Sequence, residues 1–384
     1  MSNQQMTLNP GDTLLVTVPG VTPPPPPPTI TSVAIAGPAS VQEGTLAQYT
    51  DNVVGIGNLA VIWSCSDGAI DQLGRFTAPM KVEQVQITAT SAQDPTKSAN
   101  MTVSVATVQN TTIIQPSGRD DTAALLAAIS AAASAKKILR LALNGSIPFQ
   151  LGHIDVIASL LLDSGLVLSD IPGYASGTWM LGIGDGVTIS AAGALLQMPN
   201  SFAASARDGS QYRHAIVIEH SNVNISGLSV VSAGGDGWYI RAATNVMLDK
   251  ISGSKCTRNG MSITGQVKTV FVTNSVFTDQ QNRAEAGIAD GIDFEGNGPA
   301  DFYQDCHIIN CDCSRNQERG LEISCYFLDK TTPACDVEVR GCKADNCGVN
   351  GFQTHQAGKN GPVKITITQA GNTIGGQPAQ FVQS

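Results

Sequence analysis

Charged and aromatic residues are scarce in this chain, and long apolar runs are absent. Of its 384 residues, 14% are charged and 5% are aromatic, the formal net charge is −9, and the isoelectric point is about 5.0. An acidic chain lacks the basic surface that nucleic-acid phosphates require, so we expect no nucleic-acid partner. No apolar run approaches the roughly 18 residues that span a membrane, so we expect no membrane insertion. Low charge together with 39 glycines favours turn-rich β-structure over helical bundles.

The pattern of cysteines does not indicate a disulfide framework either. The chain has nine cysteines, an odd number, and Cys65 is far from the other eight. We therefore expect free thiols, with Cys311 and Cys342 buried at equivalent positions of successive repeats. A zinc site at Cys306, Cys311 and Cys313 is the alternative, although their spacing differs from the usual ligand pairs.

What the chain does contain is a repeat in its C-terminal half. Five short phrases are similar, and their glycines are 23 to 31 residues apart. The copies are Asp236–Ile240, Asn259–Ile263, Asp290–Phe294, Arg319–Ile323 and Asn350–Thr354. Each has a turn dipeptide and then an apolar–polar–apolar strand, so we expect a glycine with positive φ at each turn. Such a period without helices predicts a parallel β-helix from about residue 140, with the five glycines in one column.

Two segments precede any folded part. Residues 1–22 hold one strand-like stretch, Thr13–Val18, which is too short to fold alone. Residues 23–28 are all proline and predict a stiff polyproline linker. We expect either a ragged terminus with a linker or an N-terminal attachment segment that docks on another protein. The first residues also lack the basic stretch and apolar core of a classical signal peptide.

Residues 29–107 predict a small β-sandwich, because short stretches of alternating apolar residues are separated by turn signals. This segment resembles the bacterial immunoglobulin-like family. The phrases that carry the resemblance are Gly37–Val41, Ala60–Ser64, Gly74–Pro79 and Ile87–Ser91. The resemblance implies a spacer or adhesion module without chemistry of its own, in which Trp63 is the buried core tryptophan.

Residues 110–384 begin with a helix and continue as coils. The phrase Gly118–Thr122 precedes apolar residues at helical spacing from Leu125 onward, with Asp120 or Asp121 as the expected N-cap. This region resembles the pectate-lyase-like right-handed β-helix superfamily. The phrases that carry the resemblance are Gly118–Thr122, Ile138–Leu141, Gln211–His214, Asn222–Gly227 and Gly287–Pro299. It implies that the short helix caps one end of the coil stack.

The expected fold class is therefore all-β: a right-handed parallel β-helix with an N-terminal capping helix, preceded by a small immunoglobulin-like β-sandwich. The superfamily contains polysaccharide lyases, glycoside hydrolases, epimerases and phage tailspikes. Neither the paired aspartates of polygalacturonases nor the calcium and arginine set of pectate lyases is apparent in this chain. The resemblance thus implies a fold and leaves the reaction open.

Alignment on the turn glycines separates inward from outward positions in each repeat. The expected inward pairs are Trp238/Ile240, Met261/Ile263, Ile292/Phe294, Leu321/Ile323 and Phe352/Thr354. Asp293, Glu295 and Glu322 point outward and are expected to cluster on one exposed face. Adjacent strands are ~4.8 Å apart, so Asp293 over Glu322 approaches the ~5–5.5 Å separation of retaining glycosidases. The diagonal distance from Glu295 to Glu322 is ~8 Å, which falls in the range of carboxyl separations found in inverting glycosidases.

We expect these three carboxylates to be catalytic, because crowding raises at least one pKa and a general acid needs a raised pKa. A solvated acidic face, or one that holds a divalent cation, is the alternative. Tyr239, Arg241 and His355 flank the three carboxylates and are the expected substrate-binding residues. The segments 277–290 and 325–336 are longer than a minimal coil, so we expect loops that wall a groove.

These features predict a protein that binds and degrades surface or capsular polysaccharide, without a cofactor unless a cation occupies the acidic face. The missing signal and the attachment segment favour a phage tailspike or related virion protein that acts outside the cell. The alternatives are a secreted bacterial polysaccharide lyase or glycoside hydrolase, and a non-catalytic structural or adhesive virion protein. Residues 380–384 show no cap helix, so we expect another subunit, as in a homotrimer, or another virion protein to cover that end.

Overall fold

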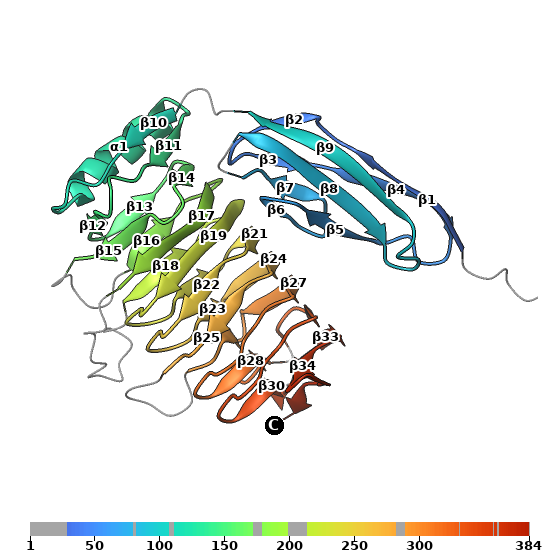
Figure 1. Ribbon diagram of the computed structural model, residues 1–384. Helices are drawn as coiled ribbons and strands as arrows, with labels where there is room; N and C mark the ends of the chain where they lie inside the picture. Colours follow the sequence, from blue (N-terminus) through green and yellow to red (C-terminus); the bar gives the residue numbers. More distant parts are fainter. Residues whose placement is uncertain are drawn as a thin grey trace, which may run out of the picture.

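A computed structural model describes residues 29–79, 82–106, 111–171, 179–198, 213–281, 289–329, 331–355, 357–358 and 361–383. Figure 1 shows a group of antiparallel strands at one end of the sequence and a stack of coils over the remainder. The predicted attachment segment 1–22 and linker 23–28 lie outside the described residues. No helix in the described ranges is long and apolar enough to cross a membrane.

The N-terminal part is built from nine short strands. They are β1 (Thr29–Ala36), β2 (Ser40–Gln42), β3 (Leu46–Gln48), β4 (Thr50–Ile56), β5 (Val61–Cys65), β6 (Ala69–Ile70), β7 (Arg75–Thr77), β8 (Glu83–Ser91) and β9 (Ser98–Ala106). They form a sheet in the order β2-β9-β8-β5, a sheet in the order β3-β7-β6, and the pair β1-β4. Val85, Ile87 and Ala89 alternate along β8 and pack in one core with Trp63. The relation of this part to immunoglobulin-like domains stays a prediction.

The coil stack has two parallel sheets that run its whole length. The fourteen-stranded sheet follows the path β10 (Thr111–Ile114), β11 (Ile138–Leu141), β14 (Leu160–Leu162), β17 (Thr188–Gln197), β19 (Val223–Val231), β21 (Thr244–Asp249), β24 (Gln266–Thr273), β27 (Phe302–Ile309), β29 (Cys335–Arg340) and β33 (Ile365–Ala370). Beside this path lie β12 (Phe149–Leu151), β15 (Val167–Asp170), β22 (Ser252–Ser254) and β25 (Val276–Thr278).

The nine-stranded sheet takes one strand from each coil. It contains β13 (Ile154–Val156), β16 (Trp179–Ile183), β18 (His214–Ile218), β20 (Trp238–Arg241), β23 (Met261–Thr264), β26 (Ile292–Glu295), β28 (Arg319–Ser324), β30 (Asn350–His355) and β36 (Val382–Gln383). Two short antiparallel pairs complete the C-terminal region: β31 (Ala357–Gly358) with β32 (Gly361–Pro362), and β34 (Thr373–Ile374) with β35 (Gln377–Pro378). Strand β36 pairs with β30, so the chain itself supplies the last strand of this sheet.

The interior of the stack is a continuous apolar core. All the predicted inward pairs are buried, from Trp238 and Ile240 to Phe352 and Thr354. Full burial of one such side chain contributes about 1.5–3 kcal/mol relative to leaving it in water. Cys311 and Cys342 are also buried, as predicted, and none of the nine thiols is in a disulfide.

Helix α1 (Thr122–Ser134) lies at the end of the stack where the first strands are (Figure 1). Leu125, Ile129 and Ala132 are buried along one side of the helix, as helical spacing predicts. Asp121 takes the N-cap position, but its carboxylate accepts from the backbone of Ser117, and Asp120 accepts from Thr122 N at 2.9 Å. The coil stack was expected to start near residue 140, which was too late. Strand β10, which precedes α1 in the sequence, already pairs in parallel with β11, which follows the helix.

The five turn glycines form one column, but not for the predicted reason. None of them has a positive φ. A Cβ on Gly237, Gly260, Gly291 or Gly320 would instead lie 2.5–2.7 Å from the carbonyl oxygen of the next glycine in the column. Glycine is therefore needed because successive coils approach closely at this corner.

Candidate functional site

The predicted outward residues line up on the outer face of the nine-stranded sheet. Asp293 of β26 pairs in register with Ser262 of β23 on one side and Glu322 of β28 on the other. Glu295 lies two residues further along β26, and His355 of β30 follows two strands later in the same column. The predicted register of this ladder is confirmed.

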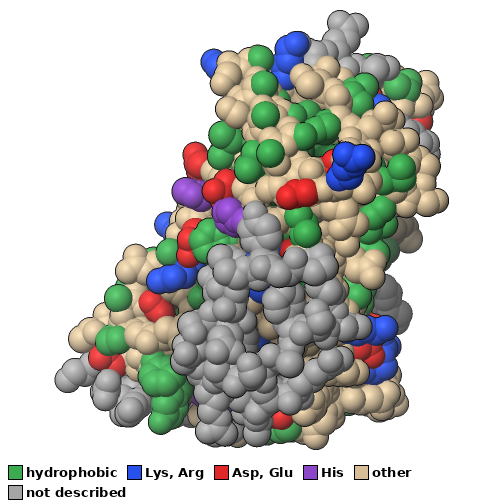
Figure 2. Space-filling view, turned by 90° about the vertical axis from the view of Figure 1, so that its left-hand side faces the viewer, with side chains coloured by type: hydrophobic (Ala, Val, Ile, Leu, Met, Phe, Trp, Pro, Cys, Tyr) green, Lys and Arg blue, Asp and Glu red, His purple; other side chains and the backbone are tan. Residues whose placement is uncertain are grey.

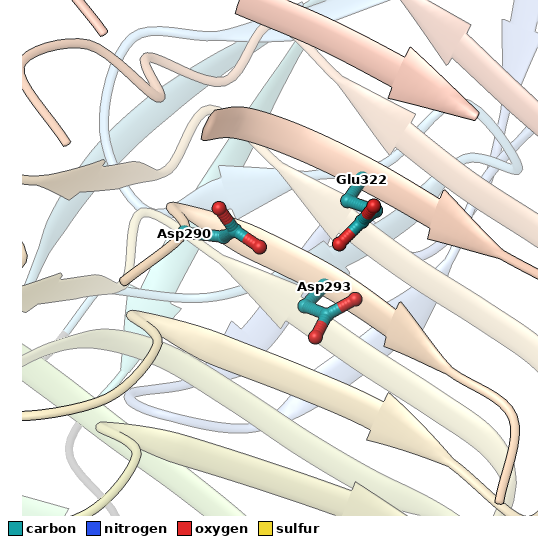
Figure 3. A group of neighbouring side chains, drawn as sticks. All are labelled: Asp290, Asp293 and Glu322. Carbon is teal, nitrogen blue, oxygen red and sulfur yellow. The ribbon is translucent and has the colours of Figure 1, made fainter. Parts of the chain in front are cut away.

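Three carboxylates converge at the centre of this face (Figure 3). Asp290, Asp293 and Glu322 each offer an oxygen, and these oxygens lie within 4.8 Å of one another. The side chains are not the exposed acidic face that the sequence predicts: Asp290, Asp293 and Glu322 are only 0%, 5% and 7% exposed. The alternation of a strand fixes which way a side chain points. It does not fix whether neighbouring strands and arginines cover it.

Asp290 was predicted only as a turn residue, yet it joins the cluster. It belongs to a buried ladder in which each side-chain oxygen accepts the backbone N–H of the equivalent residue in the next coil. Asp236 accepts from Asn259 N at 3.0 Å, Asn259 accepts from Asp290 N at 2.9 Å, and Asp290 accepts from Arg319 N at 2.7 Å. The recurrence of Asp or Asn before the turn glycine was the available signal. This ladder gives Asp290 a structural role whatever else the site does.

Two arginines lie among the carboxylates and were also missed. Arg319 Nη1 is 3.4 Å from Asp290 Oδ2 and 3.3 Å from Glu322 Oε2. Arg258 is paired with Asp236 at 3.6 Å and with Glu295 at 3.5 Å. Both side chains are largely buried, so their charges are poorly screened and offset the acidic cluster.

Asp293 has the least compensated carboxylate of the group. Asn259 Nδ2 donates to its Oδ2 at 3.3 Å, whereas no donor in the described part of the chain reaches its Oδ1. Burial raises the pKa of Asp293 well above its usual value, and the charges of Glu295, Asp290 and Glu322 raise it further. This environment favours a protonated carboxyl at neutral pH.

The other carboxylates differ in their partners. Burial raises the pKa of Asp290 to about 8 despite the opposing charge of Arg319. Burial also raises the pKa of Glu295, and Arg258 opposes that shift. Glu322 contacts Arg319 and accepts from His355 Nε2 at 2.7 Å when that ring nitrogen carries a proton. The site therefore combines a carboxyl that favours its proton with a carboxylate that has two basic partners.

A pocket of about 230 Å³ opens over this group. Asp293, Glu295, Glu322 and His355 line it together with loop residues that include Tyr326 and Phe327. The two aromatic rings are exposed and pack edge to face, with centroids 4.8 Å apart. The loop 325–336 therefore contributes to the wall of the pocket, as predicted.

The structure separates Tyr239 and Arg241 from this pocket. Tyr239 lies two strands away from Asp293 in the same column and stacks on His214, with ring centroids 4.6 Å apart. Arg241 is 59% exposed and pairs with Glu219 at 3.6 Å. On the face seen in Figure 2, acidic, basic and histidine side chains lie near one another. Four of the six predicted site residues thus share one pocket.

A divalent cation is the other occupant that three carboxylate oxygens suggest. Calcium takes six to eight oxygen ligands, so most would have to come from water or substrate. Arg319 already supplies positive charge to two of the three carboxylates. The residues present fit a protonated carboxyl cluster better than a metal centre.

A family model described as a right handed beta helix region matches residues 214–378. Residues 214–378 form a right-handed β-helix region. No curated protein matches the chain. The matched residues include every side chain of the pocket.

Several solved structures are similar to the chain at low identity. A candidate glycosyl hydrolase from Parabacteroides merdae is 15% identical over 53% of this chain and 97% of its own, with a TM-score of 0.41. The enzymatically active domain of bacteriophage CBA120 tailspike protein 2 is 14% identical, with a TM-score of 0.39. That match covers 74% of this chain and 44% of the tailspike chain. The A-module of the Azotobacter vinelandii mannuronan C-5 epimerase AlgE4 is 13% identical over 69% of this chain and 96% of its own, with a TM-score of 0.25.

Proposed function

We propose that this protein binds a polysaccharide across the outer face of the nine-stranded sheet and hydrolyses it in the pocket over Asp293 and Glu322. The observation that carries the proposal is the contrast between these two neighbouring carboxyls. Asp293 is buried with a raised pKa, and its Oδ1 has no hydrogen-bond donor among the described residues, whereas Glu322 has two basic partners. Carboxyls with environments that differ in this way are the usual acid and nucleophile of glycoside hydrolysis.

In this mechanism Asp293 Oδ1 carries the proton of the general acid. It gives that proton to the glycosidic oxygen while Glu322 attacks the anomeric carbon, so that the glycosidic bond breaks and a glycosyl–enzyme ester forms. Asp293 then takes a proton from water, and the resulting hydroxide displaces Glu322. The separation of their oxygens, within 4.8 Å, suits the roughly 5–5.5 Å spacing of retaining enzymes better than the wider inverting spacing.

The neighbouring residues have distinct roles in this mechanism. Glu295 keeps the pKa of Asp293 high, because its charge is the largest electrostatic contribution after burial. His355 orients Glu322 through their 2.7 Å contact. The apolar edges of Tyr326 and Phe327 offer stacking surface for a sugar ring. A neutral glycan fits this pocket best, because its arginines are already paired with carboxylates.

The wider role follows from the same proposal. A phage tailspike or related virion protein would carry this pocket to a host surface or capsular glycan, with residues 1–22 attached to other virion proteins, residues 23–28 as the linker, and the coil stacks joined as a trimer. A secreted bacterial lyase or hydrolase is the first rival. A non-catalytic adhesive protein is the second, and the arginine pairing of the buried carboxylates favours it, because such pairs also occur as structural networks.

A depolymerisation screen separates these functions. The full chain is incubated with neutral and acidic surface polysaccharides, and new reducing ends and bound glycan are both measured. We expect reducing ends from one neutral glycan, with Asp293→Asn retaining binding but losing product. Products with an unsaturated sugar end would indicate a lyase. Binding without any product, unchanged in Asp293→Asn, would leave the adhesive function and exclude the hydrolase.

A further inference from the structure

One end of the N-terminal part, around β6 and β7, lies beside the fourteen-stranded sheet (Figure 1). Side-chain hydrogen bonds join the two parts. They run from Ser190 Oγ to Gly44 O (3.0 Å), from Asn224 Nδ2 to Thr77 Oγ1 (3.1 Å), from Arg75 Nη1 to Asn245 Oδ1 (3.1 Å) and from Lys250 Nζ to Gly68 O. Strands β17, β19 and β21 thus form the docking face for the turn regions around β6 and β7.

Two buried aspartates face this interface, one from each part. Asp71, in the turn between β6 and β7, is 7% exposed, and Asp249, at the end of β21, is 8% exposed. The Oδ1 atom of Asp71 accepts from Leu73 N and Arg75 N at 2.8 and 2.9 Å. The Oδ1 atom of Asp249 accepts from Thr273 Oγ1 and Asn274 Nδ2 at 2.5 and 2.7 Å. Each carboxylate is therefore held by its own part of the protein.

The second oxygen of each aspartate has no such support. Neither Asp71 Oδ2 nor Asp249 Oδ2 has a hydrogen-bond partner among the described residues. Both side chains line one cavity of about 20 Å³ between the two parts. A cavity of that size holds about one water molecule, so little solvent remains to stabilise two charges. Two ionised carboxylates here would be buried, of like charge, and each supported by hydrogen bonds at only one oxygen in the described part of the chain, which is unfavourable.

The charged groups around the cavity do not remove this cost. Those that face it or lie beside it are Asp67, Arg75 and the Cys65 thiol from the N-terminal part, and Lys250 from the coil stack. Strands β3, β19 and β24 contribute only uncharged residues to the cavity: Leu46, Asn224 and Thr273. Arg75 and Lys250 oppose the shifts, yet burial still raises the pKa of Asp71 and of Asp249, and the charge of Asp249 adds to the shift at Asp71.

We propose that Asp71 and Asp249 form a proton-sharing latch that holds the N-terminal part against the coil stack. One carboxyl keeps its proton and donates it across the cavity to the other, which gives a charge-assisted hydrogen bond in place of two repelling charges. Separation of the two parts returns both groups to water, and the shared proton is released. This device is independent of glycan binding and of the carboxylates in the pocket.

The sign of the pH dependence follows from linkage. In the proposed latch the docked state holds a proton that the separated state has lost, because burial raises the pKa of both groups. Docking is thus fully favoured below the ordinary aspartate pKa of about 4 and weakens as pH rises through the raised value. For one shared proton the docking equilibrium falls by at most about tenfold per pH unit across that window.

The test is hydroxyl-radical footprinting of the full chain between pH 4 and pH 8, combined with small-angle X-ray scattering. Met247 lines the interface cavity and is covered in the docked state, so its oxidation reports separation. We expect Met247 oxidation and the radius of gyration to rise together with pH. Met261, in the interior of the stack, is the internal reference and should stay protected throughout.

Three variants make the test specific. Asp249→Asn keeps the Oδ1 acceptor and gives a permanent N–H donor to Asp71, so docking should persist to pH 8. Asp71→Asn is the reciprocal change and should behave in the same way if the first variant fails to fold. Asp51→Asn, on the exposed strand β4, should respond to pH like the unmodified chain. A chain equally compact at all pH values, or an Asp249→Asn variant that separates like the unmodified chain, would overturn the latch.

Discussion

At the scale of single residues, burial decides the chemistry of the pocket. The alternation of the repeats placed Asp293, Glu295 and Glu322 on one face, and the structure has that register. The repeat alone did not show that arginines would cover them, because Arg258 comes from another coil, and Arg319, three residues before Glu322 on β28, had been recognised only as a turn residue. Asp293 therefore has a raised pKa through loss of water first and through its neighbours second.

Glu295→Gln tests this account at the residue scale. A protonated Asp293 gives activity below its raised pKa, and that activity is lost as pH rises through it. Removal of the Glu295 charge lowers the pKa of Asp293, so the alkaline limb of kcat/KM should move down by about one pH unit. Glu219→Gln is the matched control. Glu219 follows β18, three strands from the β26 strand that carries Asp293 and Glu295, which places it roughly 14 Å away. That distance exceeds the ~10 Å Debye length at 0.1 M salt, so removal of this charge should leave the pKa of Asp293 unchanged. An unshifted limb in Glu295→Gln would contradict the role given to Glu295.

At the scale of elements, the repeat predicted the strands well and the turns poorly. Spacing of the glycines located β20, β23, β26, β28 and β30, because one strand follows each turn. The dipeptides were read as positive-φ turns, and that was wrong. The glycines are required by the contact between coils, which only the stacked arrangement reveals.

Gly291→Ala measures that contact. Its Cβ would lie 2.5 Å from Gly320 O, so the two coils must move apart or shift, at a cost of about 1–3 kcal/mol. We expect a clear fall in the thermal unfolding midpoint of the full chain. Gly298→Ala is the control, because a Cβ there meets nothing within 4 Å and its φ is not positive, so its effect should stay within about 0.5 kcal/mol. Equal midpoints for the two variants would show that the column is not tightly packed.

At the scale of the whole molecule, the sequence predicted the parts but not how they contact. The residues that join the N-terminal part to the coil stack are up to 182 positions apart, so no local pattern indicates them. The predicted spacer contacts the fourteen-stranded sheet through these residues. At the other end β36 extends the nine-stranded sheet, and its outer edge has no partner strand in the described residues.

An edge of this kind favours assembly. Exposed strand edges pair with other chains unless they are covered, so we predict that the full chain forms a trimer in which subunits cover the C-terminal end. Light scattering coupled to size-exclusion chromatography at micromolar concentration measures the mass directly. A stable monomer would contradict the prediction and leave the glycan pocket to function within one subunit.

The central claim is that Glu322 is a catalytic carboxylate and not part of a structural ion-pair network. Turnover of Glu322→Gln, compared with Glu338→Gln, tests it most directly. Glu338, on β29 of the fourteen-stranded sheet, contacts His307 at 2.7 Å, the same distance as between Glu322 and His355. Loss of either carboxylate thus breaks a similar pair. We predict that Glu322→Gln lowers kcat on the cleaved glycan by about 10²–10⁴ while Glu338→Gln leaves it unchanged. Equal turnover by both variants would contradict the proposed hydrolase.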